Sequence, residues 1–410
     1  LMTDLIRQEI AASASTIVVK VGSRALTHPD GRLDEDQIAN LARQIHDVRA
    51  TGRKVVFVSS GAVASGMGRL GLKQRPRDLA HLQAVAAIGQ SLLVEAYERC
   101  LADYGYHAAQ VLLTAEDLDH RVRYLNARNT LLALLELGAV PIINENDTVA
   151  VDELQTTFGD NDRLAALVTN LIQAPLLVLL SDVDGLYDDD PSLPTSRVIE
   201  TVTRLDQGIY DLVRDKASGL SKGGMASKLK AAHICTAAGE NVIIAKGRAE
   251  DVLSRIVAGE VVGTLFLAQG EFWGARKRWL AFSVHPRGRL ILDAGARQAV
   301  ERRGRSVLAA GIRDVQGHFE KGDVVALVDL AGEEFARGLS NYSDAEIRRI
   351  KGLKSCDIAG VLGSCPYQEV VHRDNMVVVS PSNGESQGPA EQRATKGAAT
   401  EHSAAEHGPA

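Results

Sequence analysis

Short apolar segments rich in Val, Ile and Leu alternate with longer segments of helical periodicity through the first two thirds of the chain. The strand-like segments are residues 16–21, 54–58, 108–113, 140–143, 176–180 and 242–245. The helical segments between them are residues 34–50, 78–103, 124–137, 164–172 and about 223–238. Repeated alternation of this kind is typical of a mainly parallel sheet with helices on both faces. The sequence therefore predicts an α/β sandwich.

The pattern changes after residue 276. Short strand-like segments at residues 289–292, 304–308 and 323–329, with turn residues between them and a helical turn at 347–350, predict a small β-rich, barrel-like domain. Residues 380–410 contain almost no large apolar side chain and should be disordered. We therefore expect an N-terminal extension at 1–14, the main domain at 15–268, the second domain at 276–373 and a tail at 380–410.

Polar residues gather where the fourth strand-like segment ends. The run at 140–143 is followed by Asn144, Glu145, Asn146 and Asp147, and the next helix is preceded by Gly159, Asp160, Asn161 and Asp162. The carboxyl ends of strands and the starts of helices form the crevice in which open α/β sheets bind ligands. The alternative interpretation is a polar loop in which an Asp or Asn caps a helix.

Two other strand ends carry groups suited to anions. Lys20 lies near the end of the first segment, where it can contact phosphate oxygens, although an edge-strand lysine that reaches solvent would look the same. Ser59, Ser60 and Gly61 follow the second segment. Their small size lets backbone N–H groups approach a carboxylate or phosphate, or simply allows tight packing of strand and helix.

Two later stretches extend this set. Ser181, Asp182 and Asp184 follow the fifth strand-like segment and could hold Mg²⁺ or nucleotide hydroxyls, or shape a turn. Residues 221–228 (SKGGMASK) open a helix with glycines and place Lys228 inside it, as in a phosphate cradle or a flexible surface loop. Phosphoryl transfer needs cations, carboxylates for Mg²⁺ and backbone donors, so the combined set predicts a phosphotransferase.

Composition and charge limit the kinds of core, cellular location and partner that the protein can have. Aromatic residues make up only 4% of the 410 residues, so aliphatic side chains must supply the core. Four cysteines without metal-ligand or CxxC spacing suit a cytoplasmic location. There is no unbroken apolar run of 18 residues and no signal-like leader, so we expect no membrane association. The net charge is −6, but residues 276–373 contain 17 Lys and Arg against 12 Asp and Glu, which permits a polyanion partner.

Six motifs occur in a recognisable order: VVKVGS at 18–23, SSGA at 59–62, INEND at 143–147, GDND at 159–162, SDVDGLY at 181–187 and GGMASK at 223–228. Together they resemble the glutamate 5-kinase family of the amino acid kinase superfamily, over about residues 15–373. The second domain resembles a PUA domain. In one departure, the family usually has Gly-Thr-Gly-Gly-Met where this chain has Ser221-Lys222-Gly223-Gly224-Met225, which leaves nucleotide contacts at 221–222 open.

The resemblance implies the amino acid kinase fold and roles for individual residues. Lys20, Lys228 and Asp162 would be catalytic, with Asp162 orienting the two lysines. The residues that would bind L-glutamate are Ser60, Gly61, Asp147 and Asn161. The residues that would form the ATP site are Lys20, Ser181, Asp182, Lys222, Gly223, Gly224, Met225, Ala226, Ser227 and Lys228. The ligands of Mg²⁺ are not identified.

The resemblance also implies a reaction and partners. MgATP would phosphorylate the side-chain carboxylate of L-glutamate, giving L-glutamyl 5-phosphate in the first step of proline biosynthesis. Proline would be a feedback inhibitor, and the kinase domains would form a homo-oligomer, either a dimer or a tetramer. One rival is another kinase of the superfamily, which the Asn-Glu-Asn-Asp run disfavours. The other rival is an RNA-binding protein, which the modest basic charge and the few aromatic platforms of the second domain disfavour.

Overall fold

The computed structural model describes residues 2–28, 32–149, 160–213, 223–269, 277 and 279–379. The strands of the main domain are β1 (Thr16–Val21), β2 (Lys54–Ser59), β3 (Ala108–Leu113), β4 (Val140–Glu145), β5 (Leu176–Ser181), β6 (Thr201–Val202), β7 (Asn241–Lys246) and β8 (Thr264–Phe266). They form one sheet in the order β3-β4-β2-β1-β5-β7-β8-β6. Every neighbouring pair is parallel except β7 and β8. The predicted, mainly parallel sheet is confirmed.

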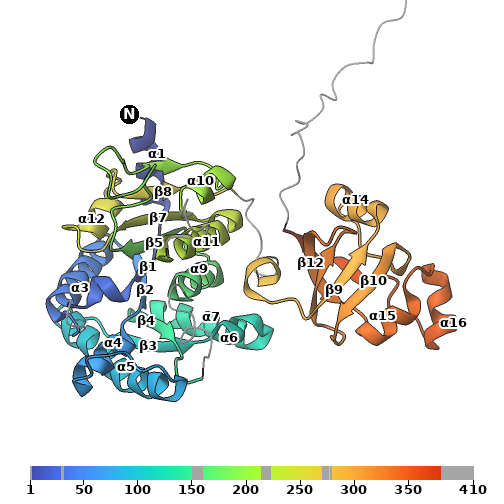
Figure 1. Cartoon of the computed structure of the whole chain (residues 1–410), viewed down its shortest axis with the longest axis horizontal. Helices are drawn as coiled ribbons and strands as arrows, with labels where there is room; N and C mark the ends of the chain where they lie inside the picture. The colour runs from blue at the N-terminus through green and yellow to red at the C-terminus, as the bar shows by residue number, and fades with distance from the viewer. Residues whose placement is uncertain are drawn as a thin grey trace, which may run out of the picture. The chain divides into compact units, whose positions relative to one another are not determined.

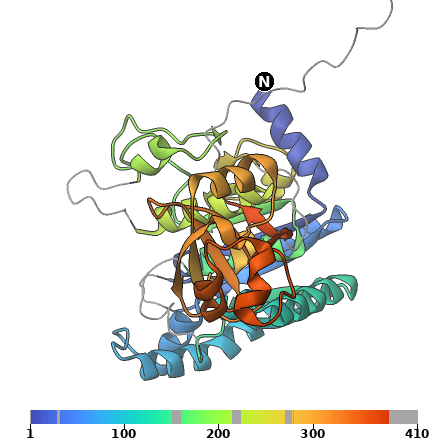
Figure 2. The same ribbon diagram turned by 90° about the vertical axis from the view of Figure 1, so that its right-hand side faces the viewer.

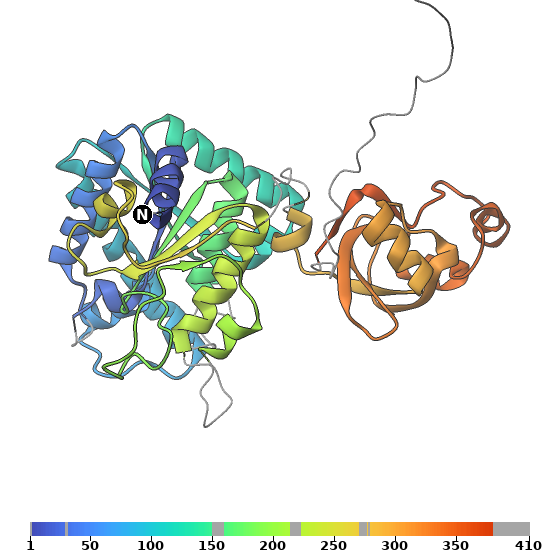
Figure 3. The same ribbon diagram turned by 90° about the horizontal axis from the view of Figure 1, so that it is seen from above.

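Helices cover both faces of this sheet (Figure 1). One face carries α3 (Glu35–Ala50), α4 (Ala62–Leu70), α5 (Leu79–Ala102) and α12 (Val252–Val257). The other face carries α6 (Ala115–Asp119), α7 (Arg121–Glu136), α9 (Asp160–Ile172) and α11 (Gly223–Ala238). Two short helices, α2 (Ser23–Leu26) and α10 (Gln207–Asp211), complete the domain. The twist of the sheet is clearest from above (Figure 3).

The side-chain alternation of β1 explains why a lysine faces one of the helical layers. Ile17 and Val19 belong to the apolar core shared with α3, α5 and α12, whereas Val18 belongs to the core on the opposite face. Because successive side chains of a strand point to opposite faces, Lys20 shares the face of Val18. Lys20 is therefore directed toward the layer that contains α9 and α11.

Helix α5 is the longest helix of the domain. By length and composition alone, it is apolar enough to cross a membrane, with a mean hydropathy of 1.2 over its best 18-residue window. Core helices of folded domains satisfy the same criteria. This one packs against α3 and α4, and its buried residues include Leu82, Leu93 and Leu101. The apolar character of α5 is thus explained by its burial against the rest of the domain.

The segment predicted as an N-terminal extension contains α1 (Met2–Ser13), the dark blue helix beside the N label in Figure 2. Its Arg7 side chain is buried and donates hydrogen bonds to three carbonyl oxygens. The acceptors are Glu200 at 2.6 Å, Val262 at 2.9 Å and Gly263 at 3.2 Å. Since these residues immediately precede or adjoin β6 and β8, α1 is tied to the edge of the sheet.

The C-terminal domain is β-rich, as predicted. Its strands are β9 (Gly288–Leu292), β10 (Ile312–Gly317), β11 (Val324–Val328), β12 (Glu334–Ser340) and β13 (Val371–Val378), in the sheet order β10-β9-β11-β12-β13. Its helices are α14 (Ala294–Arg303), α15 (Asp344–Ile350) and α16 (Ile358–Leu362), with 3₁₀ turns at Ala309–Gly311 and Ser355–Asp357. A π-helical turn, Trp279–Ser283, precedes this domain. The domain has its own apolar core.

One strand prediction in this domain was wrong. Residues 304–308 do not form a strand, because Gly304 ends α14 in the left-handed conformation with φ 56°. Val307 then makes only an isolated bridge to Val371. The predicted domain limits stay a prediction, and the tail at 380–410, Gly159, Ser221 and Lys222 lie outside the described residues.

Candidate active site

Four adjacent strands bring the predicted site residues to one edge of the sheet. The order β4-β2-β1-β5 places Asn144, Ser60, Lys20 and Ser181 at or just beyond the carboxyl ends of neighbouring strands. Strand β1 lies between β2 and β5, so Lys20 stands between the side that contains Ser60 and the side that contains Ser181. Such an edge is where parallel sheets bind ligands.

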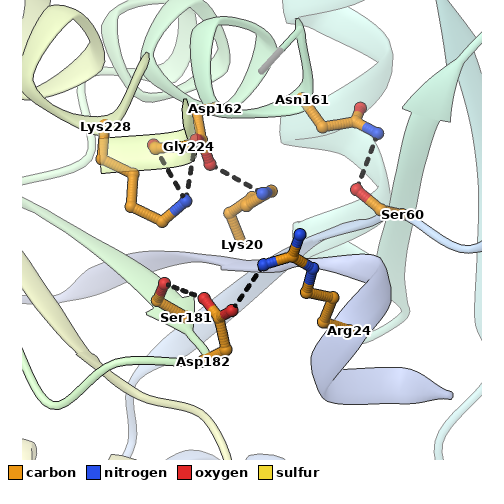
Figure 4. Close-up of polar contacts among 9 residues, drawn as sticks. All are labelled: Lys20, Arg24, Ser60, Asn161, Asp162, Ser181, Asp182, Gly224 and Lys228. Atoms are coloured by element: carbon orange, nitrogen blue, oxygen red, sulfur yellow. Dashed lines mark hydrogen bonds and ion pairs between the residues drawn. The ribbon is translucent and has the colours of Figure 1, made fainter. Parts of the chain in front are cut away.

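The centre of the site is one carboxylate shared by two lysines (Figure 4). Lys20 Nζ lies 2.6 Å from Asp162 Oδ1, and Lys228 Nζ lies 3.1 Å from Asp162 Oδ2. Their side chains are 7%, 10% and 1% exposed for Lys20, Lys228 and Asp162 respectively. Lys228 also donates to the carbonyl oxygen of Gly224 at 3.4 Å. With all three groups ionised, the cluster has a net charge of +1, which favours binding of an anion.

The pKa values of this cluster reflect opposing effects. Burial alone would raise the pKa of Asp162, but the charges of Lys20 and Lys228 outweigh it and hold that pKa below its usual range. Burial lowers the pKa of Lys228, and the carboxylate of Asp162 offsets only part of this effect. The charged form of Lys228 is thus stabilised by the carboxylate of Asp162.

A chain of amides lines the other side of the site. Asn161 Nδ2 donates to Ser60 Oγ at 2.9 Å and to Asn144 Oδ1 at 3.0 Å. Asn144 Nδ2 in turn donates to Gln90 Oε1 at 2.7 Å. All four side chains are buried. Asn144 and Gln90 were not among the predicted site residues.

Gly61 and Asp147 extend the side that contains Ser60. Gly61 precedes α4 with φ 114°, a conformation that favours glycine. The first turn of α4 begins at Ala62, so the N–H groups of a helix start come directly after Ser60 and Gly61. Asp147 is buried, and burial raises its pKa to about 6, with partial opposition from Arg75. Within the described residues, no hydrogen bond or ion pair connects Asp147 with Ser60 or Asn161.

The residues predicted for ATP lie around β5 and the start of α11. Ser181 Oγ donates to Asp182 Oδ1 at 3.1 Å, and Arg24 donates to Asp182 Oδ2 at 2.9 Å (Figure 4). Arg24 was not predicted, and its side chain is exposed. The first turns of α11 contain Gly223, Gly224, Met225, Ala226, Ser227 and Lys228. In the described part of the chain, no three or more His, Cys, Asp or Glu side chains are grouped to hold a metal ion.

Known proteins are similar to this chain over most of its length. The amino acid kinase family profile matches residues 15–246, and the PUA domain profile matches residues 288–362. A glutamate 5-kinase from Rhodopirellula baltica is 50% identical over 373 residues, which cover 91% of this chain and 96% of the relative. Glutamate 5-kinases from Bordetella petrii and Caldanaerobacter subterraneus are 49% and 46% identical over 90% and 88% of this chain, and 98% and 97% of their own lengths. The chain therefore belongs to the amino acid kinase family and, within it, to the glutamate 5-kinases.

Proposed function

We propose that the protein transfers the γ-phosphoryl group of MgATP to the side-chain carboxylate of L-glutamate, forming L-glutamyl 5-phosphate and ADP. This reaction is the first step of proline biosynthesis. The observation that supports it most directly is the buried pair of lysines around Asp162, between the amide-lined side and the β5 side of the site. The glutamate 5-kinases similar to this chain support L-glutamate as the acceptor.

Substrate binding divides between the two sides of the centre. On the amide-lined side, the Ser60 hydroxyl and the backbone N–H groups around Gly61 bind carboxylate oxygens of glutamate. Asn161 contributes to this side by its hydrogen bond to Ser60. Asp147 supplies a negative charge for the α-ammonium group. On the other side, Ser181, Asp182 and residues 222–228 bind ATP, with the glycines at the start of α11 allowing close approach of the phosphates.

Catalysis in this arrangement consists of positioning and charge stabilisation. A carboxylate oxygen of glutamate attacks the γ-phosphorus, and the bond from that phosphorus to the β–γ bridging oxygen breaks as ADP leaves. Lys20 and Lys228 stabilise the negative charge on the transferring group, while Asp162 orients both lysines. The nucleophile is already ionised at neutral pH, since a glutamate side chain has a pKa of about 4.3, so no general base is needed.

Magnesium enters as part of the MgATP substrate. Mg²⁺ commonly takes most of its ligands from phosphates and water, with one or two protein carboxylates. The described residues fit this mode, because they offer single carboxylates at the site and no cluster of three or more ligands. Asp182 is one such carboxylate, next to Ser181 at the end of β5.

The pH dependence of glutamate binding provides a test of Asp147. The KM for L-glutamate should rise as the pH falls through about 6, because protonation removes the charge that pairs with the α-ammonium group. Asp147→Asn should raise that KM by roughly 10–100-fold at pH 8, as expected for a lost charge-assisted hydrogen bond. In this variant, the KM should no longer change as the pH passes through about 6. Steady-state kinetics from pH 5 to 8.5 measure both effects. The KM for ATP is the internal control, and a normal glutamate KM in the variant would contradict the assignment.

Three further properties are part of the proposal. Proline, which shares the α-carboxylate and a cationic nitrogen with glutamate, acts as a feedback inhibitor at or near the glutamate site. The kinase domains assemble into a homo-oligomer. None of the four cysteines forms a disulfide in the structure, which suits a cytoplasmic enzyme. RNA binding by the C-terminal domain is the less favoured role, and its signature would be capture of RNA that weakens steeply with salt.

The reaction itself can be tested directly. Purified protein with MgATP should release ADP when L-glutamate is present, but not with L-aspartate, N-acetylglutamate or no acceptor. Hydroxylamine should trap the product as a hydroxamate, because acyl phosphates react with this nucleophile. ADP release that depends on another acceptor would keep the fold assignment and overturn the substrate.

A further inference from the structure

We propose that Gln90 is a positioning residue for glutamate binding. Its amide oxygen sets the direction of the hydrogen-bond chain that leaves the Ser60 hydroxyl as a donor to a substrate carboxylate. The inference rests on the proposed function, which assigns Ser60 to glutamate. It extends the site to α5, a helix that contributes none of the residues assigned above.

In the structure, the hydrogen bonds run in one direction along the chain, with Asn144 donating to Gln90 and Asn161 donating to Asn144 and Ser60. Gln90 Oε1 accepts from Asn144 Nδ2, so Asn144 presents its oxygen to Asn161. Asn161 Nδ2 then uses one hydrogen on Asn144 Oδ1 and the other on Ser60 Oγ. An amide nitrogen has only two hydrogens, so this donor is fully used. Rotating the amide of Asn144 would place its NH₂ group against the NH₂ group of Asn161.

This direction determines what Ser60 can offer a ligand. Its oxygen already accepts a hydrogen bond from Asn161, and its hydroxyl hydrogen has no acceptor among the described residues. A carboxylate can only accept hydrogen bonds, so Ser60 in this state is suited to bind one. Without the acceptor at Gln90, the Asn144 amide loses one of the two contacts that fix its orientation. The Ser60 hydroxyl would then no longer be held as a hydrogen-bond donor to a carboxylate.

The position of Gln90 is energetically unusual. The side chain is only 7% exposed, and its Nε2 atom has no hydrogen-bond partner in the described part of the chain. A buried, unpaired donor destabilises the folded state. An apolar side chain would avoid this cost, as Leu82 and Leu93 do elsewhere on the buried side of α5. The benefit that offsets this cost is the acceptor that Gln90 gives to Asn144.

Two neighbouring contacts hold α5 at a fixed distance from the site. A Cβ atom at Gly89 would lie 1.8 Å from the carbonyl oxygen of Ala62, so only glycine allows α4 to approach this closely. Farther along the helix, the Tyr97 hydroxyl lies 3.1 Å from Ser59 Oγ. Helix α5 therefore contacts Ala62 and Ser59, which lie on either side of Ser60 and Gly61, and these contacts fix the position of the helix that holds Gln90.

The test compares two substitutions of similar size. Gln90→Met removes the acceptor, and Gln90→Glu retains one whether the carboxyl group is ionised or neutral. We expect Gln90→Met to raise the KM for L-glutamate about fivefold, the usual effect of one neutral hydrogen bond, with kcat and the KM for ATP within twofold of wild type. Gln90→Glu should restore most of the loss. In a Ser60→Ala background, Gln90→Met should add no further change in the KM for glutamate.

The outcomes separate three situations. An unchanged glutamate KM in Gln90→Met, or equal defects in both variants together with a lowered melting temperature, would overturn the positioning role and leave only a structural one. Wild-type protein without glutamate-dependent turnover would overturn the proposed function, and the inference would fall with it. If Gln90→Met does not fold, Gln90→Leu, which matches the apolar residues on the buried side of α5, replaces it.

Discussion

Replacing Lys228 with Met should lower kcat by about 10²–10³-fold, the loss seen when one donor to a developing charge is removed from an active site. The KM for L-glutamate should stay within about twofold, because the lysine acts on the transferring phosphoryl group rather than on the acceptor. Met retains most of the aliphatic stem, so the packing of α11 against α9 should persist. Initial rates at saturating substrates measure the effect.

A matched control lies two residues away. Lys230 is exposed on the same helix and takes no part in the cluster around Asp162. Lys230→Met removes the same charge from the protein, and we expect it to leave kcat unchanged. If Lys228→Met retains wild-type turnover, Lys228 does not stabilise the transition state, and its ion pair is structural.

Asp162→Asn should impair both activity and folding. The substitution leaves Lys20 and Lys228 buried without their shared counter-charge, and breaking a buried ion pair in this way commonly costs about 3–5 kcal/mol. We expect a clear fall in the denaturant midpoint and a loss of kcat at least as large as that of Lys228→Met. Chemical denaturation and steady-state kinetics on the same preparations measure the two effects.

The pH dependence of this stability loss has a definite sign. Without the carboxylate, burial disfavours the protonated form of Lys228 in the folded state, so its folded-state pKa lies below that of the unfolded chain. The unfolded state then binds more protons, and the variant gains stability as the pH rises toward the ordinary lysine pKa of about 10.4. Asp182→Asn is the control, since its pair with Arg24 is exposed and should contribute little to stability. Equal losses of stability in Asp162→Asn and Asp182→Asn would show that the buried ion pairs of Asp162 contribute no more than the exposed pair of Asp182.

Local pattern was sufficient to predict much of the main domain. Along β1, Lys20 lies on the same face as Val18 because side chains two positions apart point the same way. Asp34 and Thr114 cap α3 and α6, as residues of these types commonly do. The sheet, its helical layers and the β-rich second domain follow from periodicity. Lys20 and Lys228 both contact Asp162 in the structure, and the roles of the predicted site residues remain predictions.

The missed features depend on contacts that local pattern does not encode. Gln90 contacts Asn144 across 54 positions of sequence, and its one local signal is a polar residue within the buried stripe of α5. Arg24 meets Asp182 across 158 positions. In the second domain, α14 was missed because it is strongly polar, with Val300 its one fully buried residue among those described. Strand β10 was missed because it lies at the edge of its sheet and exposes most of its side chains.

The sheet order also implies a sequence of events during synthesis of the chain. Strands β1, β2, β3 and β4 leave the ribosome first, and they are contiguous in the finished sheet. In a sheet of these four strands alone, β1 would be an edge strand, and Lys20 would have neither the counter-charge of Asp162 nor the cover of β5, because both come later in the chain. Docking of β5 and α9 removes it from water and pairs it in one event. Completion of the sheet around β1 thus also completes the charged centre of the site.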